Sequence, residues 1–328
     1  MKLVIQIPCF NEAETLPQVF RDMPRSIPGV DQIEFQIIDD GSTDATVEVA
    51  RGLGVTRVVT ASRKNRRWLG RAFKAGIDAA LAAGADIVVN TDGDNQYPSA
   101  DIPRLIEPIL QGKADIVIGD RNPGKVQEFS AIKRFLQVLG SQTVAFLTGA
   151  EVRDAVSGFR AYSRESLLKI HVLINYTYTL DTLIQAYKKG LDVVWIPIHT
   201  NAKTRESRLI TSICSKVRKS GATILRLVML YEPFKTFLWL TAFFALPGLL
   251  LLLRFMYFYF FVAGGGSGHI QSVVVGGVLL GIAAQMFVLG IIADLLSANR
   301  YLSEELLSRL RRLEGRPSEA ASKDPPAK

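Results

Sequence analysis

Short apolar runs alternate with longer stretches of helical periodicity over about the first 120 residues of the chain. The runs are rich in valine and isoleucine, which favour strands. This pattern predicts strands at Leu3–Ile7, Phe35–Ile38, Val58–Val59, Ile87–Val89 and Ile116–Ile118, with helices near Glu12–Asp22, Asp44–Arg51, Leu69–Ala83 and Ser99–Leu110. Strands that alternate with helices form a mainly parallel sheet with helices on both faces, so the predicted fold class is α/β.

The pattern changes in the last third of the chain. Thr236–Val262 contains a single charge, Arg254, and Ile270–Ala293 contains none. Each segment exceeds the ~20 residues that a helix needs to cross a bilayer. Two core helices would need a large soluble domain around them, whereas only residues 263–269 separate these segments. We therefore expect a two-helix hairpin in lipid.

Charge predicts how the hairpin is oriented. The chain of 328 residues has a formal net charge of +8, and its basic residues are concentrated in 203–226 and 300–328, on either side of the apolar segments. Positive flanks stay on the cytoplasmic side of a membrane, which places both ends and the head in the cytoplasm. The same charge favours anionic lipid over nucleic acid as a partner. The two cysteines lie far apart without a CxxC motif, which excludes a disulfide scaffold and a zinc site.

These patterns divide the chain into four parts. We expect a cytoplasmic α/β head over residues 1–207, a juxtamembrane amphipathic helix over 208–233, two transmembrane helices over 234–298, and a basic cytoplasmic tail over 299–328 with a disordered end. Apolar and basic residues of the juxtamembrane part lie on different helical faces, which is typical of a helix in the membrane interface. Packing against the sheet of the head is the alternative.

Polar clusters follow the apolar runs directly, as expected of ligand-binding residues at the carboxyl ends of parallel strands. The strongest cluster contains Asp92, Asp94 and Gln96, directly after the strand at Ile87–Val89. Residues i and i+2 of an extended segment face the same way, so both carboxylates can point into one site. Oxygen ligands without histidine or cysteine select Mg²⁺ or Mn²⁺, which recruits substrate phosphates. The alternative is a solvated Asp-Gly turn.

Two further clusters suggest a nucleoside pocket. Asp39 and Asp40 end the second strand, where an acidic side chain can accept hydrogen bonds from a ribose or a base, and residues 8–12 end the first strand. Thr43 and Asp44 more simply cap the helix that follows.

Together these motifs resemble the family-2 glycosyltransferases of the GT-A fold, and among them the polyprenyl-phosphate sugar synthases of the dolichol-phosphate-mannose synthase and bactoprenol glucosyltransferase type. The resemblance runs in family order through Ile5–Glu12, Asp39–Asp44, Asp92–Gln96, Gly119–Arg121 and Asp154–Ala161. It covers roughly the first two-thirds of the chain, and its Ser-Gly-Phe-Arg-Ala box is specific. The paired apolar helices are similar to those of bacterial members that act on undecaprenyl phosphate.

The resemblance implies a role for each matching residue. Pro8, Phe10, Glu12, Asp39, Asp40 and Asp92 would bind the nucleotide; Asp92, Asp94 and Gln96 would bind the metal; and Asp94, Asp154, Arg121, Arg134 and Arg205 would take part in catalysis. The family label for Asp154 is general base, yet a lipid phosphate is already anionic and needs no proton removed. Orientation of the sugar or acceptor is therefore the better role for Asp154, while the arginines position the acceptor phosphate.

The sequence departs from the family pattern in two loops. The glycine expected two residues after Asn65 is replaced by Arg67, so Arg66 or Arg67 is a candidate phosphate contact. Near the end of the head Arg205 occupies a glycine position, and its role is inferred from its location.

The expected function is a metal-dependent, inverting transfer of a hexose from a nucleoside-diphosphate sugar, with uridine preferred by analogy, to a polyprenyl phosphate. The enzyme would be a multi-pass protein of the bacterial inner membrane with its catalytic head in the cytoplasm. A hydroxyl-bearing lipid acceptor, with Asp154 as a base, and a non-catalytic membrane tether are the alternatives. Gly276, Gly277 and Gly281 would allow close helix contact within the hairpin or in a homo-oligomer.

Overall fold

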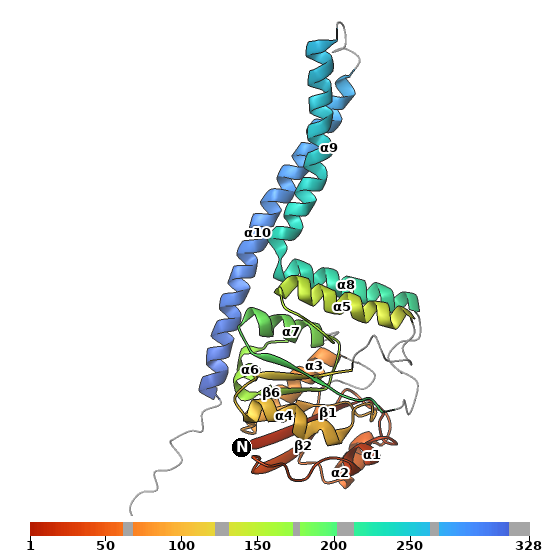
Figure 1. The fold of residues 1–328 in the computed structure, drawn as a ribbon, viewed down its shortest axis with the longest axis vertical. Coiled ribbons are helices and arrows are strands. Elements are labelled where there is room, and N and C mark those ends of the chain that lie inside the picture. Colours follow the sequence, from red (N-terminus) through yellow and green to blue (C-terminus); the bar gives the residue numbers. More distant parts are fainter. Residues whose placement is uncertain (62–67, 122–130, 173–177, 202–212, 263–268, 315–328) are drawn as a thin grey trace, which may run out of the picture. The chain divides into compact units, whose positions relative to one another are not determined.

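The computed structural model describes residues 1–61, 68–121, 131–172, 178–201, 213–262 and 269–314 (Figure 1). In chain order the elements are β1 (Lys2–Cys9), α1 (Leu16–Arg21), β2 (Gln32–Asp39), α2 (Thr46–Gly52), β3 (Arg57–Thr60), α3 (Leu69–Ala82), β4 (Ile87–Asn90), a 3₁₀ turn (Ser99–Asp101), α4 (Ile102–Leu110), β5 (Ile116–Asp120), α5 (Ala131–Thr148), β6 (Arg160–Ser163), α6 (Arg164–Lys169), α7 (Thr179–Lys188), β7 (Val193–Pro197), α8 (Ile213–Tyr231), α9 (Pro233–Phe261) and α10 (Ile270–Glu314).

The strands form one seven-stranded sheet in the order β3-β2-β1-β4-β6-β5-β7. Strands β1, β2, β3 and β4 pair in parallel, and β5 pairs in parallel with β7. Only β6 runs antiparallel, between β4 and β5. The predicted mainly parallel α/β sheet is confirmed, and it places the carboxyl ends of β1, β2, β4, β5 and β7 at the same edge, where β6 begins.

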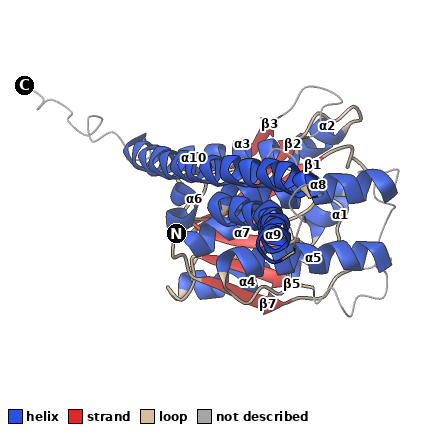
Figure 2. Ribbon diagram, turned by 90° about the horizontal axis from the view of Figure 1, so that it is seen from above, coloured by secondary structure: helices blue, strands red, loops and turns tan. Residues whose placement is uncertain are grey.

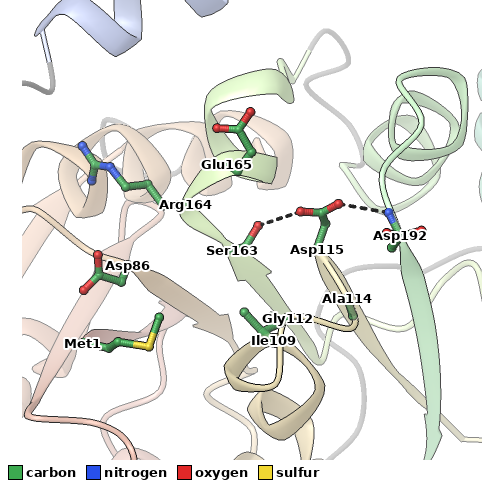
Figure 3. A pocket seen from close by; sticks show the side chains of 10 residues that line it. All are labelled: Met1, Asp86, Ile109, Gly112, Ala114, Asp115, Ser163, Arg164, Glu165 and Asp192. Atoms are coloured by element: carbon green, nitrogen blue, oxygen red, sulfur yellow. Dashed lines mark hydrogen bonds between the residues drawn. The ribbon is translucent and has the colours of Figure 1, made fainter.

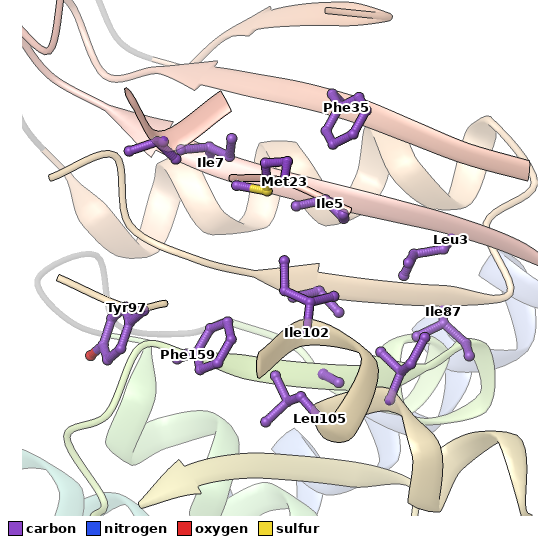
Figure 4. Close-up of a cluster of buried hydrophobic side chains, with 14 of the residues drawn as sticks. Leu3, Ile5, Ile7, Met23, Phe35, Ile87, Tyr97, Ile102, Leu105 and Phe159 are labelled. Carbon is purple, nitrogen blue, oxygen red and sulfur yellow. The ribbon is translucent and has the colours of Figure 1, made fainter. Parts of the chain in front are cut away.

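Each face of the sheet is covered by its own helices (Figure 2). On one face Leu3, Ile5 and Ile7 of β1 pack with residues of α1 and α4, as Figure 4 shows for part of this cluster. On the other face α3 packs against β1, β2 and β3. Because the side chains of a strand alternate between its two faces, β1 contributes apolar residues to the first face and Gln6 to the second.

The predicted helices and strands agree with the structure except at their ends. The first helix begins at Leu16 rather than near Glu12. Residues 12–15 form a turn instead, in which the N–H groups of Thr15 and Leu16 donate to the carbonyl oxygen of Glu12. Asn11, directly before this turn, has a left-handed φ of 56°, which asparagine tolerates better than most residues.

The chain forms two compact units, residues 1–223 together with residues from 304 onward, and residues 224–303. The second unit contains α9 and the apolar part of α10, both long and apolar enough to cross a membrane. They approach closely at two glycines: a Cβ added to Gly248 would lie 3.1 Å from the carbonyl oxygen of Gly276, and one added to Gly276 would lie 3.0 Å from that of Gly248. Gly277 and Gly281 face open space among the described residues. The predicted close contact within the hairpin thus involves Gly276.

The end of α10 belongs to the head. Residues assigned from sequence to a free tail continue the helix to Glu314, and those from Glu304 onward pack against the α/β domain. Glu304 forms a buried ion pair with Lys189 at 2.8 Å, and Arg311 donates to the carbonyl oxygens of Leu167 and Ile170 at the end of α6. These contacts hold the end of α10 against the head by pairing polar groups of both.

Candidate active site

The motifs after β1 and β2 are joined by hydrogen bonds. The backbone N–H of Asn11 donates to Ser42 Oγ at 3.1 Å, and the N–H of Thr43 donates to Asn11 Oδ1 at 2.7 Å. The N–H of Glu12, the next residue, donates to Thr46 Oγ1 at 2.8 Å. The two strand-end loops therefore form one rigid wall.

The loop after β4 packs against the same wall. A Cβ added to Gly93 would lie 3.1 Å from Cys9 Sγ and 3.3 Å from Glu12 Cγ, so the absence of a side chain at Gly93 allows this close approach. Thr15 Oγ1 lies 2.8 Å from the carbonyl oxygen of Gly93 and 2.9 Å from Glu12 Oε2. Residues of the first and third motifs, which sequence alone placed at one edge, are thus in direct contact.

Asp92 and Asp94 are half-buried in this loop and interact electrostatically. Loss of water and then the charge of Asp94 raise the pKa of Asp92 to about 7, against the opposing influence of Arg121. Two neighbouring, partly buried carboxylates are a good fit for a divalent cation, which removes their repulsion. The part of the chain that the structure describes contains no cluster of three acidic, histidine or cysteine ligands. A cation held by this pair would therefore complete its shell with water and substrate oxygens.

The backbone around Asp94 is fixed from two sides. Its carboxylate accepts the N–H of Gln96 at 3.1 Å, and Asn95 adopts a left-handed φ of 59°. Asn201, four residues after β7, donates its side-chain nitrogen to the carbonyl of Asn95 at 2.9 Å and its N–H to that of Gln96 at 3.0 Å. Sequence analysis did not select Asn201, because nothing in its neighbourhood forms a motif.

A buried ion pair lies at the end of β5. Arg121 donates from Nε to Asp154 Oδ2 at 2.6 Å and from Nη2 to Oδ1 at 2.8 Å, and both side chains are almost fully buried. The backbone N–H of Arg121 also donates to Asp154 Oδ2 at 3.3 Å. Burial alone would lower the pKa of Arg121, but Tyr97 and the bonded carboxylate raise it above its ordinary value. Both residues were selected from sequence, but their pairing was not.

The remaining predicted residues differ in their surroundings. Asp39 accepts the N–H of Ser42 at 2.9 Å, and Asp40 accepts the N–H of Trp68, at the start of α3, at 3.1 Å. Asp40 therefore joins the end of β2 to the start of α3, while Asp39 stabilises the turn after β2. Pro8 and Phe10 flank the end of β1. Arg134 lies in α5 with its side chain outside the description, and Arg66, Arg67 and Arg205 lie outside the described residues.

The residues between these motifs form a network that sequence analysis missed. Asn90 donates to the carbonyl of Gly158 and to the hydroxyl of Tyr178, each at 2.9 Å. Arg160, from the Ser-Gly-Phe-Arg-Ala box, is buried and donates to the carbonyls of Ser157, Thr179 and Ala155. Arg160 therefore fixes the loop before β6 rather than presenting a charge to substrate. The Ser-Gly-Phe-Arg-Ala box was the sequence signal that could have pointed to this network.

A hollow of about 340 Å³ lies at the other edge of the sheet (Figure 3). Its lining includes Asp86, Asp115 and Asp192, which directly precede β4, β5 and β7. Asp115 accepts hydrogen bonds from Ser163 Oγ at 3.3 Å and from the N–H of Asp192 at 3.1 Å. These carboxylates are thus at the amino ends of strands, away from the predicted site.

The fold and the carboxyl-end edge of its sheet define a GT-A type sugar transferase architecture, in which acidic residues follow the strands of a Rossmann-like sheet. Residues 4–170 match the pattern of "Glycosyl transferase family 2". The chain belongs to this family, and the family and fold expected from sequence are confirmed.

Several relatives are similar over different parts of the chain. A polyprenol monophosphomannose synthase of Mycolicibacterium smegmatis is 31% identical over 206 residues, which cover 60% of this chain and 76% of the relative. A glycosyltransferase of Haloferax volcanii, AglJ, is 29% identical over 321 residues and covers 94% of this chain and 97% of its own. A crystal structure of glucosyl-3-phosphoglycerate synthase from Mycobacterium tuberculosis with Mn²⁺, UDP and product has a TM-score of 0.51 at 25% identity and covers 70% of this chain and 78% of its own. The similarity to AglJ includes the helices after the head.

Proposed function

We propose that this glycosyltransferase moves a hexose, with inversion, from a nucleoside-diphosphate sugar to a polyprenyl phosphate at the cytoplasmic face of a bacterial inner membrane. The names of its relatives support this acceptor class: one makes polyprenol monophosphomannose, and another, from Micrococcus luteus, is an undecaprenyl-phosphate mannosyltransferase that is 28% identical. The UDP bound in the mycobacterial structure supports a uridine donor.

The observation that carries the proposal is the pairing of Asp154 with Arg121. Both carboxylate oxygens of Asp154 accept hydrogen bonds from the guanidinium, and the pair is buried. A carboxylate held in this way is a poor general base, which a hydroxyl acceptor would need. A phosphate acceptor needs no base, because it is already anionic at neutral pH. The pairing therefore favours a lipid phosphate over a lipid hydroxyl.

The chain's own residues would bind and orient the two substrates. Asp40 and Glu12 would bind the nucleoside at the ends of β1 and β2, and Asp92 and Asp94 would hold a divalent cation. When bound, Mg²⁺ or Mn²⁺ supplies Lewis acid stabilisation of the departing nucleoside diphosphate. Arg121, held in place by Asp154, would keep a positive charge beside the point where two anionic substrates meet. An acceptor phosphate oxygen attacks the anomeric carbon, and the bond to the diphosphate breaks with its electron pair leaving on the diphosphate.

The apolar helices and α8 would hold the head at the membrane surface, where the lipid acceptor is found. Helices α9 and α10 are almost entirely exposed along their apolar windows, unlike core helices of a soluble protein. Helix α8, just before them, exposes Arg218 and Lys219 together with the apolar Leu225 and Met229. Such a helix suits the boundary of an anionic membrane, where polyprenyl phosphates present their headgroups.

The test is a transfer assay with purified full-length protein, a panel of UDP- and GDP-sugars, and undecaprenyl phosphate. We expect a glycosyl phosphate of the predicted mass that is labile to mild acid and has an inverted anomeric centre. Chelation should abolish its formation, and added Mn²⁺ or Mg²⁺ should restore it. An acid-stable glycoside would instead indicate a hydroxyl acceptor.

Substitution tests the metal assignment separately. Asp94→Ala should reduce turnover by at least about two orders of magnitude, since the cation would lose a ligand. Asp192→Asn, a carboxylate at the opposite edge of the sheet, is the matched control and should leave turnover unchanged. Near-normal activity of Asp94→Ala in the presence of chelator would contradict the proposal.

A further inference from the structure

Tyr97 lies at the centre of the candidate site, although no motif role was assigned to it. It follows Gln96 directly, is 3% exposed, and stacks on Phe159 with ring centroids 5.2 Å apart and planes 12° apart. Figure 4 shows the two rings side by side, with the Tyr97 oxygen at the tip of its ring. A phenylalanine would fill the same space, and burying a hydroxyl is costly unless it is hydrogen-bonded. The hydroxyl therefore serves something other than packing.

The hydroxyl adds a contact to the Arg121 guanidinium on the side away from Asp154. Asp154 accepts hydrogen bonds from Nε and Nη2, and Tyr97 Oη accepts one from the remaining nitrogen, Nη1, at 3.4 Å. A carboxylate on one edge fixes the plane of a guanidinium, and a second acceptor on the other side limits how far the group can slide. Tyr97 and Asp154 together hold all three nitrogens.

The same oxygen also contacts the backbone at Gly158, next to Asp92. Tyr97 Oη accepts the N–H of Gly158 at 3.2 Å, while Asn90 holds the carbonyl of Gly158 from the other side. A Cβ added to Gly158 would lie 3.5 Å from both carboxylate oxygens of Asp92, so this peptide lies directly against the proposed metal ligand. One hydroxyl thus connects the surroundings of Asp92 with those of Arg121.

We propose that Tyr97 is a positioning residue for glycosyl transfer, whose hydroxyl fixes the positions of Arg121 and the Gly158 peptide relative to Asp92. The inference rests on the proposed function, because these relative positions bring the donor diphosphate and the acceptor phosphate together. It concerns the geometry of bound substrates rather than their affinity. Loss of the hydroxyl should therefore reduce kcat more than it changes KM for the donor.

The test compares Tyr97→Phe with Tyr162→Phe in the full-length protein. Tyr162 is equally buried, in β6, and its ring packs against Phe73, so its substitution controls for loss of a core hydroxyl. We expect Tyr97→Phe to lower kcat roughly 10- to 100-fold, with the donor KM within about threefold of wild type, when activity is measured well below the thermal midpoint. The midpoint itself should fall by about a few degrees, because two buried N–H donors lose an acceptor. Tyr162→Phe should keep kcat within about twofold. 3-Fluorotyrosine at position 97, a weaker acceptor of the same shape, should give an intermediate kcat.

A spectroscopic readout separates this inference from the proposed function. In protein labelled with ¹⁵N at arginine Nε, the Arg121 signal is identified by its absence in Arg121→Lys. Tyr97→Phe should shift or broaden this signal, and Tyr162→Phe should not. If the wild type transferred sugar to no polyprenyl phosphate, the proposed function would fail, and this signal would still decide the role of Tyr97.

Three results would overturn the inference. One is a Tyr97→Phe variant with normal kcat and an unmoved Arg121 signal. Another is a fall in kcat that disappears when activity is measured well below the thermal midpoint of the variant, which would make the role one of stability. The third, needed if Tyr97→Phe did not fold, is a 3-fluorotyrosine protein with wild-type kcat.

Discussion

At the scale of single residues, the ion pair between Arg121 and Asp154 has the largest energetic consequence. The pair is buried and bidentate, so removing either partner would leave a charge that is neither solvated nor paired. Breaking a buried pair from one side typically costs 3–5 kcal/mol, although replacing both partners with apolar residues is often neutral. The pair therefore need not stabilise the fold in order to be indispensable to it.

This reasoning predicts an asymmetry between single and double substitutions. Asp154→Ala should lower the free energy of unfolding by about 3–5 kcal/mol, whereas Arg121→Met with Asp154→Leu should recover most of that stability and remain inactive. Chemical denaturation in detergent measures the first effect and the transfer assay the second. Glu151→Ala, which breaks an exposed pair with Arg153, is the control and should cost at most about 1 kcal/mol. A double variant as unstable as Asp154→Ala would contradict the argument.

The sequence predicted those site residues that belong to a recognisable motif. It did not predict those that matter only through contacts made in the folded chain. Asp92 and Asp94 were recognised because two carboxylates directly after a strand are chemically unusual. Tyr97 and Asn201 are ordinary residues of core and loop, and their importance depends on which backbone groups they meet. That information arises only when β4, β5, β6 and β7 are placed in one sheet.

At the scale of elements, α9 and α10 approach closely because Gly248 and Gly276, which face each other, have no side chains. Gly248→Val should place atoms against the carbonyl oxygen of Gly276, which is backbone and cannot move aside. Overpacking of this kind typically costs 1–3 kcal/mol. The thermal midpoint of the purified protein should fall, while Gly277→Val, on the open side of α10, should leave it unchanged. Equal effects of both variants would show that the hairpin does not pack at Gly248.

The end of α10 makes stability depend on pH through His171. Its Nε2 lies 3.0 Å from Ser308 Oγ and 3.1 Å from the carbonyl oxygen of Glu304, and Arg311, Lys189 and Asp78 also act on it electrostatically. Burial, followed by the charges of Arg311 and Lys189, lowers the pKa of His171 to about 4. The unfolded chain would bind a proton near pH 6.5, and the folded protein would not.

The sign of the effect follows from this difference. Between about pH 6.5 and pH 4 the unfolded state binds more protons, so the free energy of unfolding should fall as the pH is lowered through this range, by on the order of 1–3 kcal/mol. Unfolding measured at several pH values should show this slope, and His171→Gln should flatten it. His199→Gln, at an exposed position, should not. A slope that persisted in His171→Gln would assign it to other groups.

The order of elements was predictable in the first 120 residues because each strand and helix there follows its own periodicity. The antiparallel insertion of β6 was not, since Arg160–Ser163 is short and its register depends on β4 and β5. The docking of residues 304–314 was also missed. A charged amphipathic helix end has the same pattern whether water or a protein surface covers its polar face.

At the scale of the whole molecule, the proposed reaction joins a soluble donor to an acceptor confined to the headgroup layer. Attraction of the basic face of α8 to anionic lipid, worth about 1 kcal/mol per cation, should raise the local concentration of acceptor without affecting the donor. Arg218→Gln with Lys219→Gln should therefore raise the acceptor KM several-fold in anionic vesicles at low salt. The donor KM should stay unchanged, and the defect should fade in neutral vesicles or high salt.

The charge-matched control for this prediction is Arg51→Gln with Lys113→Gln. Both residues are exposed on the head, in α2 and after α4, and their loss changes the net charge equally. If this pair reproduced the acceptor defect, net charge rather than the face of α8 would be responsible.

The position of residues 304–314 has a consequence for how the protein is made. Lys189 and the end of α6 are translated long before the helix turns that cover them, and the whole apolar hairpin is synthesised in between. A ribosome adds roughly 5–20 residues each second, so the nascent head must wait several seconds with these polar groups uncovered. In the proposed membrane arrangement, the hairpin would enter the bilayer before the final contacts of the head are made. Maturation of the enzyme would then be coupled to its delivery to the membrane, and a chain that stalled before insertion would remain an incomplete head open to chaperones and proteases.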